Sequence, residues 1–191
     1  NLEPLGEIFA SAGFDGTVRL CDIHTGECVH ILQGHTGWAR AIAFSQNGEI
    51  LASGSVDRTI RLWDVRSGEC LQILQGHTDW IRSVAFSSSS EIVVSGSVDL
   101  TVRVWDISTG ECLKILQCHT SRINSVAFSS NGKIIAACSR DGTIRLWDFE
   151  TGECLKILKS ERPYEEMNIT GVTGLTEVEK ATLKALGAVE N

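Results

Sequence analysis

Three residue types that together form a hydrolytic site occur in one stretch of the chain and return 42 residues later. In serine hydrolases a histidine takes the proton of a serine hydroxyl, and an aspartate orients the histidine. The residues here are His35, Ser53 and Asp57 in one stretch, and His77, Ser95 and Asp99 in the next. Because a catalytic site is rarely copied within one chain, we expect these residues to be structural and the chain to be no enzyme.

The two sets belong to a repeat that runs through most of the sequence. "RTIRLWDVRSGECLQILQGHT" begins at Arg58, and "LTVRVWDISTGECLKILQCHT" begins 42 residues later at Leu100. The same 42-residue step links three Trp-Asp pairs, whose tryptophans are Trp63, Trp105 and Trp147. A fixed period of this length predicts that each copy is one supersecondary unit, stabilised by packing on its neighbours.

Each unit alternates apolar and polar residues with a period near two. In the third unit this pattern predicts four short strands, at residues 80–86, 91–97, 101–106 and 111–116. Serine-rich and glycine-containing runs separate them, which is typical of turns between strands.

Four strands per unit, with recurring Gly-His and Trp-Asp pairs, resemble the WD40 repeat. Over residues 7–158 the chain is similar to bacterial WD40 repeat proteins. This resemblance implies an all-β fold of β-propeller-type blades, each a sheet of four antiparallel strands. The physical argument agrees, because a lone sheet cannot bury both faces, whereas blades packed around an axis cover one another.

The repeat predicts about four blades, of which the first is incomplete. "EIFASAG" at Glu7 aligns with "EILASGS" at Glu49, which is the second strand of the next unit. The units are expected at about 1–34, 35–76, 77–118 and 119–158. Four blades leave three assemblies open: an open arc, a ring, or a pair of copies joined through exposed strand edges.

Residues 159–191 depart from the repeat. Residues 166–172, "EMNITGV", can form a strand that completes the first blade, or a loosely attached loop. Thr176 and Glu179 fit a capping box, which predicts a short helix at 177–186. This tail resembles the C-terminal ends of large bacterial proteins that couple a nucleotide-binding switch domain to many WD40 repeats.

The family resemblance implies a polar network in each complete blade. Trp63 would donate its indole N–H to a strand hydroxyl, of Ser53 or alternatively Ser55, and that hydroxyl would link through His35 to Asp57. The expected network residues in all blades are His35, Ser53, Asp57, Trp63, His77, Ser95, Asp99, Trp105, His119, Asp141 and Trp147. Three departures predict weaker outer networks: Cys21 replaces a tryptophan, Cys118 a glycine and Ala137 a serine.

Composition argues against several other classes of protein. The net charge of −7 and the pI near 5.2 offer no basic excess for a nucleic acid partner. No apolar run predicts a membrane span, and no leader sequence is visible. Four of the seven cysteines recur at strand starts, where we expect partly buried free thiols in a reducing cytoplasm: Cys28, Cys70, Cys112 and Cys154. We expect no cofactor or metal, since neither a phosphate loop nor metal-ligand spacing is present.

Binding is therefore the expected function, and the resemblance implies where it occurs. Residues that follow each Gly-His, or precede each turn aspartate, would line the top rim of the channel. The candidate partner-binding residues are Trp38, Arg40, Trp80, Arg82, Arg122, Asn124 and Arg140, with Val56 and Val98 beside them. Tryptophan and arginine often anchor interfaces, and a cationic rim favours an acidic protein or peptide. Repeat duplication alone is the competing explanation for these residues.

Two functions follow from this interpretation of the sequence. The first is a protein–protein interaction scaffold that docks or senses a partner for a larger signalling protein. The second is a structural element that self-assembles into a homo-oligomeric ring.

Overall fold

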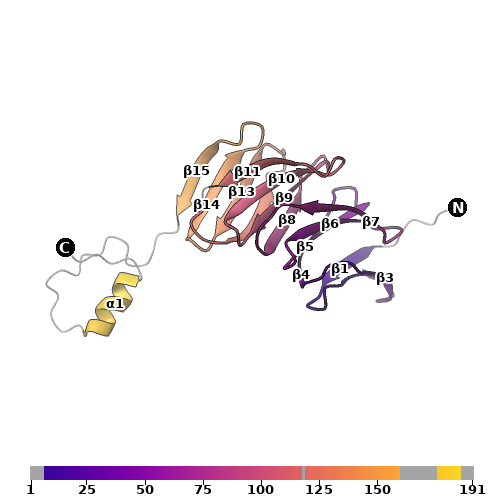
Figure 1. Cartoon of the computed structure of the whole chain (residues 1–191), viewed down its shortest axis with the longest axis horizontal. Helices are drawn as coiled ribbons and strands as arrows, with labels where there is room; N and C mark the ends of the chain where they lie inside the picture. Colours follow the sequence, from indigo (N-terminus) through magenta and orange to yellow (C-terminus); the bar gives the residue numbers. More distant parts are fainter. Residues whose placement is uncertain (1–6, 118, 160–175, 186–191) are drawn as a thin grey trace. The chain divides into compact units, whose positions relative to one another are not determined.

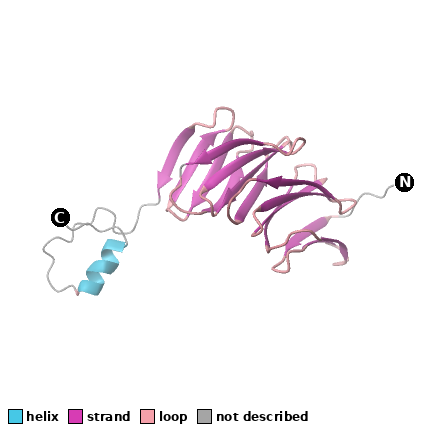
Figure 2. Cartoon of the chain, in the orientation of Figure 1, coloured by secondary structure: helices cyan, strands magenta, loops and turns pink. Residues whose placement is uncertain are grey.

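The computed structural model describes residues 7–117, 119–159 and 176–185. The chain divides into two compact units, Asn1–Leu158 and Lys159–Asn191. The described part of the first contains strands and connecting loops, and the second contains the helix α1, Glu177–Ala185. Figure 2 shows this division between strand and helix. The predicted all-β class with a short helix near the C-terminus is confirmed.

Four antiparallel sheets follow one another along the chain (Figure 1). The first sheet has three strands, and the other three sheets have four. The strands of the first two sheets are β1 Ile8–Ala12, β2 Val18–Asp22, β3 Cys28–Leu32, β4 Ala39–Phe44, β5 Ile50–Ser55, β6 Thr59–Asp64 and β7 Cys70–Gln75. Those of the last two are β8 Ile81–Phe86, β9 Ile92–Ser97, β10 Thr101–Asp106, β11 Cys112–Gln117, β12 Ile123–Phe128, β13 Ile134–Ser139, β14 Thr143–Asp148 and β15 Cys154–Lys159.

The hydrophobic core lies between successive sheets rather than inside any one of them. Between the second and third sheets, Ile60 and Leu62 of β6 share a buried cluster with Ile81, Val93 and Trp105 of the next sheet. Equivalent clusters join the first sheet to the second and the third to the fourth. Each sheet therefore supplies one wall of its neighbour's core, which explains why the sequence repeats.

Two glycines allow the sheets to approach closely at these junctions. A methyl group at Gly54 would lie 2.5 Å from Cγ2 of Ile81, and one at Gly96 would lie 2.5 Å from Cγ2 of Ile123. The junction of the first two sheets instead has alanines at the equivalent positions, Ala12 and Ala39. Glycine opposite isoleucine and alanine opposite alanine are thus two ways to fill a similar space.

The exposure of the recurring cysteines differs from the sequence expectation. The recurring cysteines were expected to be partly buried, but Cys28, Cys70 and Cys154 are exposed and Cys112 is half-buried. Each opens the outermost strand of its sheet, and Cys112 also packs against the cluster between the second and third sheets. The expected closing strand at 166–172 and the last residue of the expected helix lie outside the described residues.

We predict that Gly96→Ala lowers the free energy of unfolding by about 1–3 kcal/mol, because the added methyl group overpacks the junction with Ile123. Urea denaturation followed by circular dichroism measures the change. A double-mutant cycle with Ile123→Ala is the control, and the coupling should be favourable because the pair then resembles Ala12 with Ala39. If the two substitutions instead lowered the free energy of unfolding additively, the close approach of the third and fourth sheets at Gly96 would be contradicted.

Candidate functional site

A continuous chain of hydrogen bonds crosses the second sheet. The indole Nε1–H of Trp63 on β6 donates to the Ser53 hydroxyl at 2.7 Å, and His35 Nε2 lies 2.7 Å from the same oxygen. His35 Nδ1 lies 2.9 Å from Oδ2 of Asp57, which sits in the turn after β5. The hydroxyl in contact with the indole is thus that of Ser53 and not that of Ser55, which donates to the carbonyl of Gly37.

The direction of the hydrogen bonds follows from what each group can donate. An ionised Asp57 only accepts, so Nδ1 of His35 carries a hydrogen and donates it. Nε2 then accepts from the Ser53 hydroxyl, whose oxygen in turn accepts from Trp63. Every polar hydrogen of the chain meets one acceptor, which is the condition for burying such a network without a penalty.

The third sheet repeats the network and the fourth interrupts it. His77 contacts Asp99 at 2.7 Å and Ser95 at 2.7 Å, and Trp105 donates to Ser95 at 2.8 Å. In the fourth sheet His119 contacts Asp141 at 2.9 Å, and its ring lies 5.7 Å from that of Trp147. Ala137 stands at the position of the two serines, and among the described residues Nε2 of His119 is buried without a hydrogen-bond partner.

The connections from serine to histidine to aspartate are those of a catalytic triad, but the surroundings differ. The hydroxyls of Ser53 and Ser95 belong to fully buried residues, and each already accepts an indole hydrogen. A nucleophile must reach its substrate and leave its proton with the histidine. These serines lack that access, so the geometry favours a role in stability.

The network holds its aspartates in the ionised form. Burial alone raises the pKa of Asp57, but the hydrogen bonds from His35 and Thr59 outweigh it, and the pKa lies well below its usual range. The pKa values of Asp99 and Asp141 are lowered too: burial raises each, and the hydrogen bonds of the histidine and of the threonine two residues on prevail. These carboxylates therefore stabilise the fold in their charged state.

A second group of residues lies at the start of the first strand of each four-stranded sheet, which we call the inner strand: β4, β8 and β12. A β-bulge positions this group. In the second sheet Ala39 pairs with Ser55 and Ala41 with Gly54, so the intervening Arg40 has no partner on β5. The same irregularity leaves Arg82 unpaired on β8 and Asn124 on β12. A bulge of this kind turns the extra side chain away from the regular alternation of the sheet. Arg40 and Asn124 are exposed, and Arg82 is half-buried.

We call the residues at the start of the inner strands, together with Arg122 and Arg140, the rim. Its arginines lie close enough to affect one another, and they lack acidic partners among the described residues. Burial, together with the charges of Arg40 and Arg122, lowers the pKa of Arg82. Within the described part of the chain, neither these three arginines nor Arg140 form an ion pair. The Nε atoms of Arg82 and Arg122 are buried and have no hydrogen-bond partner there.

Apolar side chains stand beside these cations. Trp38 and Trp80 are exposed, and their carbonyls accept from the backbone N–H groups of the half-buried Val56 and Val98. Phe14 packs edge-to-face on Trp38 with ring centroids 4.7 Å apart. Sequence analysis missed Phe14, although the 42-residue step from Val56 points to it.

Phe14 and Arg40 line a small hollow at the rim. Its volume is about 200 Å³, and Ala12 and Ala39 complete its lining. At the equivalent place in the last sheet, the exposed Arg140 donates its backbone N–H to the carbonyl of Arg122. The rim thus offers aromatic surface, unpaired guanidinium groups and a concave site together.

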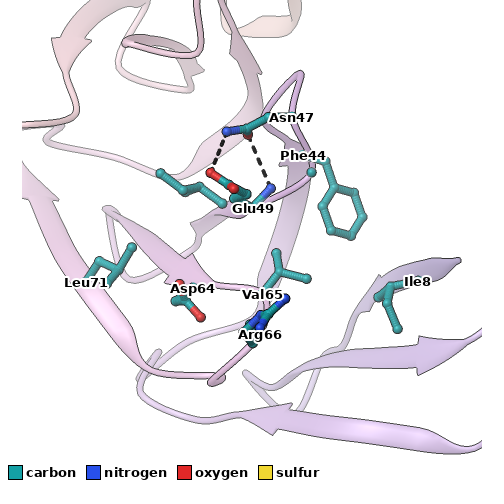
Figure 3. A pocket seen from close by; sticks show the side chains of 10 residues that line it. Ile8, Phe44, Asn47, Glu49, Asp64, Val65, Arg66 and Leu71 are labelled. Atoms are coloured by element: carbon teal, nitrogen blue, oxygen red, sulfur yellow. Dashed lines mark hydrogen bonds between the residues drawn. The ribbon is translucent and has the colours of Figure 1, made fainter. Parts of the chain in front are cut away.

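A larger cavity, of about 700 Å³, lies at the opposite ends of the strands, between the first and second sheets (Figure 3). Ile8, Phe44 and Val65 give it an apolar wall, and Asn47 donates to Glu49 beside it. At the next junction, Ala43 of the inner strand β4 packs in the equivalent cluster. The described part of the first sheet has no inner strand, which accounts for the space.

A protein-family model matches most of the strand-containing unit. The family model described as "WD domain, G-beta repeat" matches residues 26–64, 68–106 and 110–148. The chain belongs to the WD40 repeat family. WD40 repeats generally mediate protein–protein interactions. The three matched segments contain the Trp-Asp pairs of the second, third and fourth sheets.

Similar proteins share short stretches with this WD40 chain. An uncharacterized WD repeat-containing protein of Nostoc sp. is 82% identical over 33 residues, which are 17% of this chain and 2% of that protein. A nuclear distribution protein of Uncinocarpus reesii is 49% identical over 37 residues, 19% of this chain and 8% of its own length. The WD repeat-containing protein pop1 of Schizosaccharomyces pombe is 48% identical over 33 residues, 17% and 4% of the two chains. The matches thus span less than a tenth of each relative.

The part of the chain that the structure describes has neither a metal-ligand cluster nor a membrane-spanning helix. No cluster of three or more histidine, cysteine, aspartate or glutamate side chains there is arranged to hold a metal ion. The helical segment within those ranges is too short and too polar to cross a bilayer.

We predict that the buried carboxylates make the fold sensitive to acid. Because the pKa of Asp99 is lowered by folding, its stabilisation is present above about pH 4 and is lost as the pH falls further. Asp99→Asn should lower the free energy of unfolding at pH 7 by about 1–3 kcal/mol, and by less near pH 2. Urea midpoints measured at both pH values test this. Glu111→Gln, at an exposed carboxylate, is the control, and a pH-independent cost of Asp99→Asn would contradict the assignment.

We also predict that removing a hydroxyl from the third sheet and adding one at the equivalent position of the fourth sheet change the stability in opposite directions. Ser95→Ala should lower the free energy of unfolding by about 1–3 kcal/mol, because it leaves Nε2 of His77 and Nε1 of Trp105 without a hydrogen-bond partner. Ala137→Ser should raise it by about 1 kcal/mol, because the new hydroxyl reaches Nε2 of His119. Thermal melting of both variants checks the pair. A destabilising Ala137→Ser would count against the network.

Proposed function

We propose that this chain is a protein-interaction module that binds an acidic or carboxylate-bearing peptide at its rim. The observation that carries the proposal is the cluster of Arg40, Arg82 and Arg122, in which the charges of Arg40 and Arg122 act on Arg82 and which forms no ion pair among the described residues. A carboxylate ligand would offset this concentration of positive charge and accept hydrogen bonds from guanidinium N–H groups. Trp38, Trp80 and Phe14 would supply apolar contact beside the charges.

The charge of the whole chain supports a local rather than a general electrostatic attraction. The net charge is −7, so an acidic partner is repelled by most of the surface and attracted by the rim alone. Such an arrangement favours recognition of one oriented segment over nonspecific adsorption. Asn124, which replaces the bulge arginine in the fourth sheet, would end the cationic run and contribute a neutral hydrogen-bonding group.

The setting of this module is part of the same proposal. The relatives are much longer than the matched stretches, which is consistent with a docking part of a larger signalling protein. All six described cysteines are free thiols, which suits a reducing compartment such as the cytoplasm. The buried serines of the apparent triads support binding rather than catalysis.

We predict that a fluorescein-labelled oligo-glutamate peptide binds the chain and that binding weakens as salt is added. The triple variant Arg40→Gln, Arg82→Gln and Arg122→Gln should raise the dissociation constant at least about 30-fold, because each charge-assisted contact contributes on the order of 1 kcal/mol. Fluorescence anisotropy measures the effect.

The matched control removes the same charge elsewhere. Arg66→Gln, Lys133→Gln and Lys156→Gln change three exposed cations that lie outside the rim. This variant should bind as the parent does. Equal losses in the two triple variants, or no binding by the parent, would refute the rim as the binding site.

A further inference from the structure

The fourth sheet leaves open a face that every preceding sheet has covered. Ile144 of β14 is 43% exposed, and Leu158 of β15 is 39% exposed. The equivalent residues of the other three sheets are at most 6% exposed, because the next sheet packs on them: Val18, Leu32, Ile60, Leu74, Val102 and Leu116. We call this surface the end face; Ala136 and Leu146, both half-buried, complete it.

The first sheet leaves open the opposite kind of face. Phe9 of β1 is 44% exposed, whereas Leu51, Val93 and Ile135 at the same repeat position are fully buried. Ile23 is 55% exposed, and its equivalent Val65 is only 4% exposed. We call this surface the start face; the half-buried Cys21, at the tryptophan position, lies in it.

The two open faces are the two halves of one recurring junction. At all three described junctions a surface equivalent to the end face packs on a surface equivalent to the start face of the following sheet. We propose that the end face of one chain docks on the start face of a second copy of the same chain. This interface is separate from the rim and does not depend on the peptide-binding function proposed above.

One residue of the end face, Cys138, favours the start face of a second copy over a blade that carries isoleucine on its inner strand. Cys138 stands at the position of Gly54 and Gly96, where even a methyl group would lie 2.5 Å from the isoleucine of the next inner strand. A blade with isoleucine at that position would therefore clash with the larger thiol-bearing side chain. Among the described residues of the first sheet, none stands at the repeat position of Ile81 and Ile123, so none of them would meet Cys138 in this way.

The symmetry of such a contact limits the size of the assembly. Different surfaces meet, so the contact is heterologous and forms either a closed ring or an open filament. Two copies bring together eight sheets, at the upper end of the four to eight that propellers typically contain. A third copy would exceed that range. We therefore expect a closed dimer.

Sedimentation velocity of the purified 191-residue chain over about a hundredfold range of concentration tests the proposal. We expect a species of twice the 20.8 kDa chain mass. Ile144→Asp with Leu158→Asp should raise the dissociation constant on the order of 100-fold, because two buried apolar contacts become desolvated charges. Both residues are exposed in the single chain, so circular dichroism should remain unchanged.

The control uses two other exposed residues of β15. Leu155→Asp with Ile157→Asp adds the same charges at positions that are exposed in every complete sheet, as Leu71 and Ile73 show. This variant should dimerise as the parent does. A parent that stays monomeric at every concentration overturns the proposal, whether the faces are covered by the tail or by further blades of a longer polypeptide. An equal loss of dimerisation in both double variants overturns it too.

A mixing experiment distinguishes the two faces. Phe9→Asp disables the start face alone, and the Ile144, Leu158 double variant disables the end face alone. Each should be monomeric by itself, and an equimolar mixture should regain association through the one intact pair of faces. A mixture that remains monomeric, or either variant dimerising alone, would refute head-to-tail docking.

Discussion

The contact between the apolar faces of neighbouring sheets is the interaction on which the rest of this molecule depends. No sheet here has a core of its own, since the buried clusters all lie between one sheet and the next. Stability in such an array is a sum of terms between neighbours. The hydrogen-bonded network from tryptophan to aspartate is secondary to it, because the indole it fixes forms part of each junction.

This dependence accounts for both the repetition and the exceptions to it. Residues at the junctions recur because each must fit the same kind of neighbour, as Leu51, Val93 and Ile135 do. Exceptions gather in the first and last sheets, where Cys21, Ala137 and Cys138 replace the usual residues. The missing serine in the fourth sheet leaves a histidine nitrogen unsatisfied but does not disturb the strands around it. The network therefore refines a structure that apolar packing already determines.

The sequence was sufficient to predict the fold and much of the polar geometry. The strands of the third sheet begin and end within one residue of the expected ranges, because the period-two pattern and the turn residues act locally. The atoms of Ser53, His35 and Asp57 were expected to form one chain, and the distances bring them together. Exposure was harder to predict. The cysteines at outer strand starts are in solvent because burial depends on which strand has a neighbour, and a period alone does not say so.

If the rim binds the partner as proposed, the β-bulge on each described inner strand separates recognition from folding. Its extra residue pairs with nothing across the sheet, so Arg40, Arg82 and Asn124 occupy positions where the side chain is not constrained by the ladder. An array of near-identical units can then present a different set of side chains at each bulge while its backbone stays the same. Ligand preference in such a protein can change through a few positions, one per unit, without any change in the scaffold that carries them.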